Sequence, residues 1–177
     1  MTAKISFKAL PLNTRYVSNN LIIGARQGLS GLADLKKEGV SIVLDVRKKH
    51  PIISNYQTIL CKLLGLKRIQ IPTTLAKASF SLDSFDKASQ IIADNKSKKI
   101  FLHCRHGLHR SVIVALLSQI KQGAVKTSED FDNFLSKNDF FKVKKSEGFF
   151  KKFKHNKNKQ KIDNFEFIKK IFFDKFM

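Results

Sequence analysis

The chain has 177 residues, of which 42% are apolar, so it can bury the core of one domain. Its two cysteines cannot form a disulfide framework and favour a reducing, cytoplasmic setting, a property that also fits delivery into another cell. No apolar run is long enough to span a membrane, and residues 1–12 lack the apolar core of a secretory signal. We therefore expect neither a transmembrane segment nor a secretory signal. The net charge of +20 excludes no class of partner by itself.

The first half of the chain alternates between strand-like and helix-like segments. After residues 1–13, which show no periodicity, Arg15 to Ile23 predicts a hairpin, with Asn19 and Asn20 at the positive φ angles of a tight turn. The expected order is then helix, strand, helix, strand and helix, over residues 30–38, 40–46, 54–64, 67–71 and 82–94. Gly39 and Gly65 end the first two helices, and Ser81 is the expected N-cap of the third.

A strand at residues 99–103 and helices at 111–122 and from Thr127 or Ser128 to Leu135 complete the pattern. This alternation predicts an α/β fold, with a central parallel or mixed sheet flanked by helices on both faces. No repeat or linker interrupts the chain. We therefore predict one domain over residues 1–177, with its core at about 14–136 and a basic, Phe/Lys-rich helical extension at about 137–177.

The segment from Ile100 to Ser111, I-F-L-H-C-R-H-G-L-H-R-S, carries the chemistry. A loop between a strand and a helix N-terminus can turn backbone N–H groups inward, and this arrangement binds a tetrahedral anion and favours a thiolate. Cys104 is then the expected nucleophile, and Arg110 the bidentate phosphate ligand. Gly107 allows close backbone approach, while Ser111 can cap the helix and offer its hydroxyl to the sulfur.

The sequence His-Cys-five residues-Arg-Ser resembles the signature loop of the cysteine-dependent protein tyrosine and dual-specificity phosphatases. The His-rich version here is most similar to small atypical dual-specificity phosphatases, some of which act on inositol phosphates. The resemblance implies a dual-specificity-phosphatase-like fold, a phosphocysteine intermediate and no cofactor. It implies that His103 orders the loop and that the loop residues and one distant arginine bind the substrate: Arg105, His106, Gly107, Leu108 and Arg47.

Two residue pairs admit a simpler interpretation. Arg47 and Asp45 resemble a polar and Arg pair of related phosphatases, but they could also only form hydrogen bonds at the end of their strand, which is the preferred interpretation for Asp45. Cys61 could form a regulatory bridge to Cys104, as in some relatives, although core packing of Cys61 is the preferred interpretation. The spacing of the two Cys and five His matches no zinc site, so we expect no metal.

The general acid is the main departure from the family pattern. Most members place an Asp soon after a Pro-containing strand, where this chain reads Ile71-Pro72-Thr73-Thr74. Three candidates remain. Asp83 and Asp86 fit the first turn of a helix for dipole reasons alone, and His109 lies inside the loop, where it could protonate the leaving oxygen or only add charge. Without an acid, substrates with good leaving groups, or slow turnover, are favoured.

The distribution of charge bears on the substrate. Residues 46–82 contain no acid and seven basic residues, so a site beneath them would favour a polyanion. The preferred function is a phosphotyrosine or dual-specificity protein phosphatase. The alternatives are an inositol polyphosphate or phosphoinositide phosphatase and a catalytically weak phosphate-binding module. The basic stretch from Lys142 to Lys161 is interpreted as a solvated helix, with membrane-surface contact second and nucleic acid less favoured.

Overall fold

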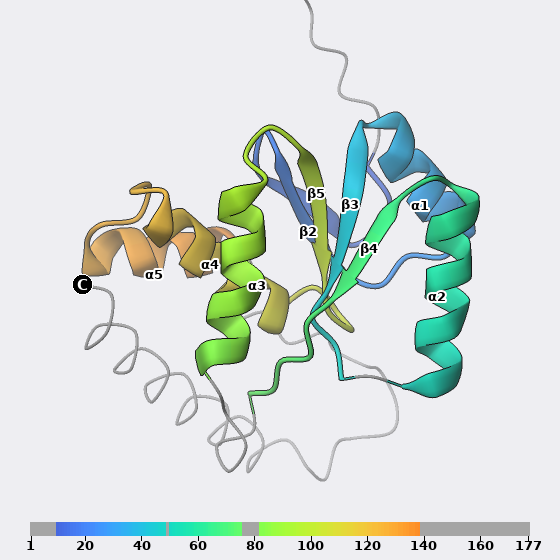
Figure 1. The fold of residues 1–177 in the computed structure, drawn as a ribbon. Helices are drawn as coiled ribbons and strands as arrows, with labels where there is room; N and C mark the ends of the chain where they lie inside the picture. Colours follow the sequence, from blue (N-terminus) through green and yellow to red (C-terminus); the bar gives the residue numbers. More distant parts are fainter. Residues whose placement is uncertain (1–9, 49, 76–81, 139–177) are drawn as a thin grey trace, which may run out of the picture.

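The computed structural model describes residues 10–48, 50–75 and 82–138, and Figure 1 shows them as a sheet with helices on both sides. The sheet has five strands in the order β1-β2-β5-β3-β4. Strands β2, β5, β3 and β4 are parallel, and β1 pairs antiparallel with β2. The strands are β1 (Thr14–Ser18), β2 (Leu21–Gly24), β3 (Val40–Asp45), β4 (Lys67–Gln70) and β5 (Lys99–His103).

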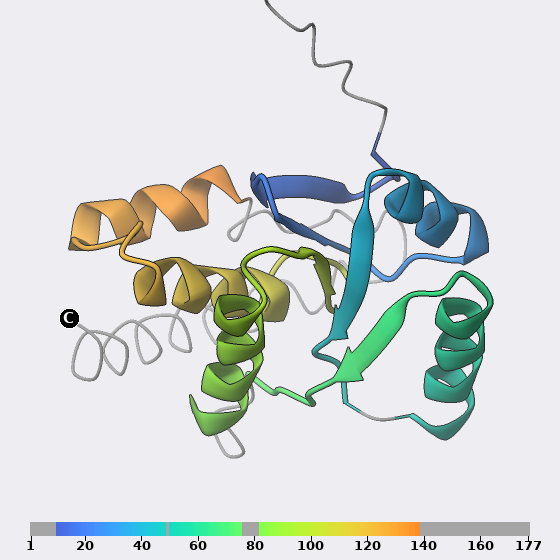
Figure 2. The same ribbon diagram turned by 45° about the horizontal axis from the view of Figure 1, so that its top comes forward.

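The helices divide between the two faces of the sheet, as Figures 1 and 2 show. They are α1 (Leu29–Lys37), α2 (Pro51–Leu63), α3 (Leu82–Asp94), α4 (Arg110–Lys121) and α5 (Ser128–Lys137). Side chains of a strand alternate between faces, so Val43 of β3 packs with α1 and α2, whereas Ile42 and Leu44 pack with α3, α4 and α5. Both faces are therefore apolar, as expected for a largely parallel sheet.

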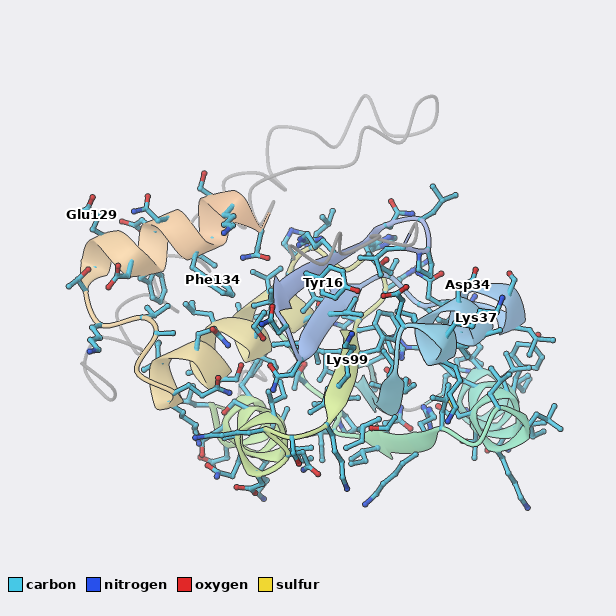
Figure 3. All side chains as sticks on the ribbon, turned by 90° about the horizontal axis from the view of Figure 1, so that it is seen from above. Tyr16, Asp34, Lys37, Lys99, Glu129 and Phe134 are labelled. Carbon is cyan, nitrogen blue, oxygen red and sulfur yellow. The ribbon has the colours of Figure 1, made fainter. Side chains whose placement is uncertain are left out.

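Tyr16 of the edge strand β1 lies on the α1 and α2 face of the sheet and makes two polar contacts there. The Tyr16 hydroxyl donates a hydrogen bond to Glu38 Oε2 at 2.8 Å, and the Lys99 ammonium lies 5.7 Å from the Tyr16 ring centre (Figure 3). These contacts tie the hairpin to α1 and β5.

The prediction of an α/β fold with a mixed, two-sided sheet is confirmed, and most predicted elements differ from the observed ones by one or two residues. Helix α2 begins three residues early, with Pro51 at its first turn. The predicted turn geometry is wrong, because Asn13 is the one non-glycine residue with positive φ in the described part of the chain. Asn20 instead links β2 to β5. Its side-chain amide donates a hydrogen bond to Lys96 O, and its main-chain carbonyl accepts one from Ile100 N. Ser81 and residues 139–177 lie outside the described residues.

Candidate active site

Cys104 directly follows β5, at the carboxyl edge of the sheet, and only 3% of its surface is exposed. The chain then loops over residues 105–109 into the N-terminus of α4. The order strand, loop and helix is the one that the sequence predicts. It places the sulfur at the positive end of the α4 dipole.

Donated hydrogen bonds stabilise the thiolate of Cys104. Burial alone would raise the pKa of Cys104, but the hydroxyl and amide of Ser111 and the amides of Gly107 and His106 lower it below its ordinary value. The Ser111 Oγ lies 3.4 Å and the Gly107 N 3.3 Å from Sγ. The Cys104 thiol therefore ionises at a lower pH than a free thiol, which suits the nucleophilic role predicted for it.

The loop is shaped by its glycine and by a distant arginine. Gly107 has φ of +73°, and a Cβ there would lie 2.3 Å from the carbonyl carbon of Gly24 at the end of β2. Arg15 donates from Nη2 to Gly107 O at 3.1 Å and to Asn138 O. Arg15 thus fixes the orientation of the peptide that follows Gly107.

One predicted role at the helix start is changed by the structure. His109 is the N-cap residue of α4 and makes no side-chain cap hydrogen bond, whereas Ser111 lies inside the helix. The prediction that Ser111 caps the helix is therefore wrong, because its hydroxyl faces the sulfur instead. Arg110 donates from Nη1 to Thr73 O at 3.3 Å, and Thr73 is itself bound to Val46 O.

A fully buried carboxylate, Asp45, lies at the end of β3 and pairs in register with His103 of β5. Burial would raise the pKa of Asp45, but hydrogen bonds from Arg47 and Arg68, with their positive charge, hold that pKa well below its usual range. Arg47 donates from Nη2 at 2.6 Å and Arg68 from Nη2 at 2.7 Å to Asp45 Oδ2. Arg47 therefore forms the strand-end contacts that the sequence allowed and also reaches a cavity wall.

A hydrogen-bond chain connects this carboxylate to the nucleophile. Arg47 Nη2 donates to Gln57 Oε1, so the Gln57 amide nitrogen points to His103 Nε2, 3.1 Å away. Since that nitrogen is a donor, Nε2 accepts and the proton of the neutral imidazole is on Nδ1, which donates to Cys104 O at 3.3 Å. Burial lowers the pKa of His103 to about 4, so the ring is neutral at pH 7. The expected role of His103 in ordering the loop fits these contacts.

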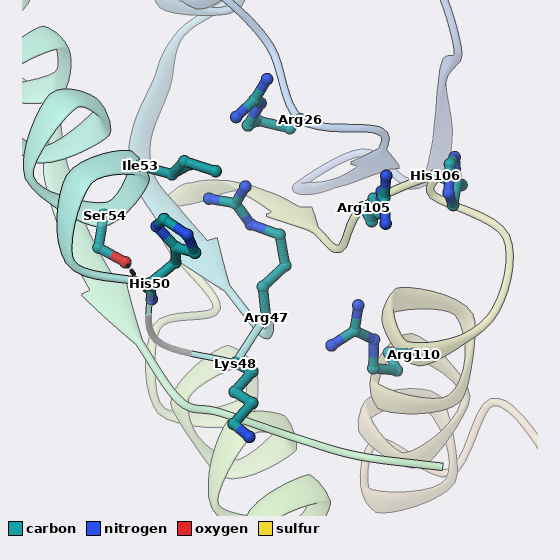
Figure 4. Close-up of a pocket in the computed structure, with 9 residues that line it drawn as sticks. All are labelled: Arg26, Arg47, Lys48, His50, Ile53, Ser54, Arg105, His106 and Arg110. Carbon is teal, nitrogen blue, oxygen red and sulfur yellow. Dashed lines mark hydrogen bonds between the residues drawn. The ribbon is translucent and has the colours of Figure 1, made fainter. Parts of the chain in front are cut away.

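Described residues around the loop line a smaller and a larger cavity. The smaller, of about 160 Å³, exposes the nucleophile and is lined by Thr74, Leu75, Cys104, Arg105, His106, His109 and Arg110. The larger, of about 560 Å³, shares Arg105, His106 and Arg110 with the first and adds Arg26, Arg47, Lys48, His50, Ile53 and Ser54 (Figure 4). We call these the phosphate cavity and the basic cavity. Leu108 is half-buried and belongs to neither lining set.

The structure separates the candidates for the general acid. Asp86 forms an ion pair with Lys121 at 2.9 Å, at the opposite end of α4 from the loop, about 16 Å away at 1.5 Å per residue. Asp83 is exposed in the first turn of α3 and lines neither cavity. His109 lines the phosphate cavity beside Cys104 and is the candidate that the geometry favours.

This arrangement can transfer a phosphoryl group through the sulfur. Attack by the Cys104 thiolate forms an S–P bond and breaks the P–O bond, while Arg110 and the loop amides stabilise the equatorial oxygens. Water then breaks the S–P bond, and the Ser111 hydroxyl donates to the departing thiolate. Among the described residues, no cluster of three or more His, Cys, Asp or Glu side chains could hold a metal ion.

The two cysteines lie in different apolar clusters. Cys61 packs with α1 and α2, and Cys104 packs with α4, and both thiols are free. Burial raises the pKa of Cys61 to about 11, which disfavours its thiolate. Core packing is the role that the structure gives to Cys61.

Fold and site define a cysteine-based phosphatase of the tyrosine and dual-specificity type. The chain belongs to the family described as DSP-PTPase phosphatase fused to NAD+ kinase, whose family model matches residues 11–164. A comparison with curated protein sequences finds no match. The recognition of the dual-specificity superfamily from the signature loop is therefore confirmed.

Solved structures share the fold at low sequence identity. The core catalytic domain of the PP-IP phosphatase SIW14 from S. cerevisiae is 16% identical with a TM-score of 0.60, over 77% of this chain and 82% of that chain. P. aeruginosa TpbA, solved as a cysteine-to-serine variant with pTyr, is 15% identical with a TM-score of 0.60, over 75% of this chain and 78% of that chain. At these identities the likeness concerns the fold.

Several site residues were missed in the sequence because they are far from the signature loop. The sheet topology places the ends of β2, β3 and β4 beside Cys104. This alone brings four distant residues to the signature loop: Arg15, Arg26, Gln57 and Thr73. Only Thr73 could have been found from the sequence, since it lies where most members of the family place the acid.

Proposed function

We propose that this phosphatase acts on small polyphosphorylated molecules of the inositol phosphate class, including phosphoanhydrides. The observation that carries the proposal is the basic cavity, which adjoins the phosphate cavity and is lined by five Arg or Lys residues without a carboxylate. One phosphate of the substrate would bind at Cys104, while a neighbouring phosphate of the same molecule would bind in the basic cavity. A singly phosphorylated side chain would leave these charges unused.

The leaving group supports the same substrate class. No carboxylate occurs between Asp45 and Asp83, so the segment that follows β4 offers no Asp to protonate a departing alkoxide. A phosphoanhydride needs little proton donation, and SIW14, which shares the fold, is named a PP-IP phosphatase. An aryl phosphate needs equally little, and TpbA was solved with pTyr, so phosphotyrosine protein is the second candidate.

Phosphate release tests both candidates. We would assay the reduced, metal-free protein with inositol hexakisphosphate, an inositol pyrophosphate, a phosphotyrosine peptide and an aryl phosphate, with Cys104→Ser as the inactive control. We expect the highest kcat/KM for the pyrophosphate. A phosphotyrosine peptide that exceeded it would favour the second candidate, and binding without release by the wild-type protein would indicate a phosphate-binding module.

The basic cavity can be tested separately. Because charge-assisted hydrogen bonds each contribute about 1.5–3 kcal/mol, Arg26→Gln should raise KM for the polyphosphate about tenfold or more. Turnover of the aryl phosphate should change little. Lys126→Gln removes an exposed charge next to α5 and is the matched control. Equal effects of the two variants would contradict a specific role for the cavity.

A further inference from the structure

Helix α2 carries a row of large apolar side chains on its solvent-exposed side. Their exposed fractions are 77% for Ile52, 57% for Tyr56, 56% for Ile59 and 73% for Leu63, and two further large apolar residues are exposed elsewhere in the described part of the chain. At about 100° per residue, the four lie within an arc of about 60°. We call them the α2 apolar stripe.

The stripe takes no part in the packing of α2 against the described core. The opposite side of α2 is already buried and packs through Ser54, Gln57, Leu60 and Cys61. In Figures 1 and 2 the helix lies at the outer edge of the molecule, beside α1 and β4, with its far side uncovered by described elements. Contiguous exposed apolar surface of this kind marks an interaction site.

The charges around the stripe restrict what can cover it. No acidic residue occurs between Asp45 and Asp83, whereas Lys48, Lys62 and Lys67 are exposed on or beside α2. A second copy of the chain would bring the same positive surface against itself. Residues 139–177 carry 12 Lys against five acidic residues and would be repelled as well. The complementary partner is both apolar and negatively charged.

We propose that the α2 apolar stripe binds the protein to an anionic membrane surface. The stripe is a convex ridge on a single helix, which can enter the boundary between headgroups and acyl chains without a matching groove. Its tyrosine suits that boundary because it combines an apolar ring with a polar hydroxyl. The neighbouring lysines would contact acidic headgroups.

Membrane binding through this face would also position the basic cavity. Ile52 of the stripe and Ile53 of the cavity lining are consecutive, and Lys48 and His50 of the lining directly precede α2. The rim of the cavity therefore lies next to the same surface. This inference concerns attachment and holds for any substrate of the enzyme.

The chain contains no tryptophan, so a single Trp reports on the stripe alone. We would place it with Tyr56→Trp, and as a matched control with Asn133→Trp, an exposed position on α5 at the opposite side of the structure from α2. The full-length variants are mixed with vesicles of phosphatidylcholine, with and without phosphatidylserine. With acidic vesicles we expect a blue shift and quenching by brominated lipid for Tyr56→Trp and no change for Asn133→Trp.

Other results would overturn the proposal. Vesicle binding without a blue shift in Tyr56→Trp would assign attachment to another region, such as the basic residues 142–161. Emission that is already blue without vesicles would mean that the stripe is covered by the chain itself, or by a second copy if the shift disappears on dilution. Insertion only after addition of an acidic peptide or protein would favour a protein partner.

A second variant measures the contribution of the stripe to binding. Ile59→Asn with Leu63→Asn removes two exposed apolar side chains, so we expect cosedimentation with acidic vesicles to weaken about tenfold or more. Hydrolysis of a soluble aryl phosphate should be unchanged, and this shows that the variant is folded. Unchanged cosedimentation would contradict the proposal.

Discussion

The buried imidazole of His103 should make folding stability depend on pH. Its pKa is about 4 in the folded protein because of burial, against 6.5 for an ordinary His. Between about pH 6.5 and pH 4, His103 is protonated in the unfolded chain but neutral in the folded chain. The free energy of unfolding therefore decreases as the pH decreases. The loss attributable to His103 between about pH 7.5 and pH 5 is about 2 kcal/mol, and it approaches about 3 kcal/mol below pH 4.

Urea unfolding at the two pH values measures this loss. His103→Gln cannot be protonated and keeps an acceptor and a donor at similar places, so its stability should fall about 2 kcal/mol less than that of the wild type. His50→Gln replaces an exposed imidazole and is the control, with an unchanged loss expected. An equal loss in wild type and His103→Gln would refute the assignment of a neutral His103. Nitrogen chemical shifts at pH 7 should also show the proton on Nδ1.

Three further variants test other parts of the site. Ser111→Ala should shift the pH profile of Cys104 alkylation by iodoacetamide to higher pH and should slow breakdown of the phosphoenzyme. An unshifted profile would contradict the 3.4 Å contact between Ser111 Oγ and Cys104 Sγ. Gly107→Ala should abolish phosphate binding and lower stability by about 2 kcal/mol or more, because its φ is +73° and Gly24 blocks a Cβ. Asp45→Asn should lower the free energy of unfolding by about 3–5 kcal/mol, since two largely buried guanidinium groups lose their fully buried counter-charge, and a loss below about 1 kcal/mol would show that water replaces it.

The fold was predictable where local patterns determine it. The apolar runs at residues 42–44 and 100–102 favour strands covered on both faces, and Gly39 and Gly65 take the positive φ angles that end helices. The turn at Asn19 and Asn20 was not predictable in detail. Its geometry follows from the contact of Asn20 with β5, a strand that lies about 80 residues away in the sequence.

The candidate active site likewise combines residues that local sequence predicts with residues that only the tertiary structure brings together. The sequence by itself predicted Cys104 as the nucleophile, Arg110 as the phosphate ligand and the loop between them, because both residues lie close to one helix N-terminus along the chain. Tertiary structure alone decided that Gln57 sets the tautomer of His103, that Arg15 holds the loop and that Asp86 is bound to Lys121. It also decided that the basic residues after β3 line a cavity beside Cys104. Such contacts depend on which strand ends meet at one edge of the sheet, a matter of long-range packing rather than of local spacing.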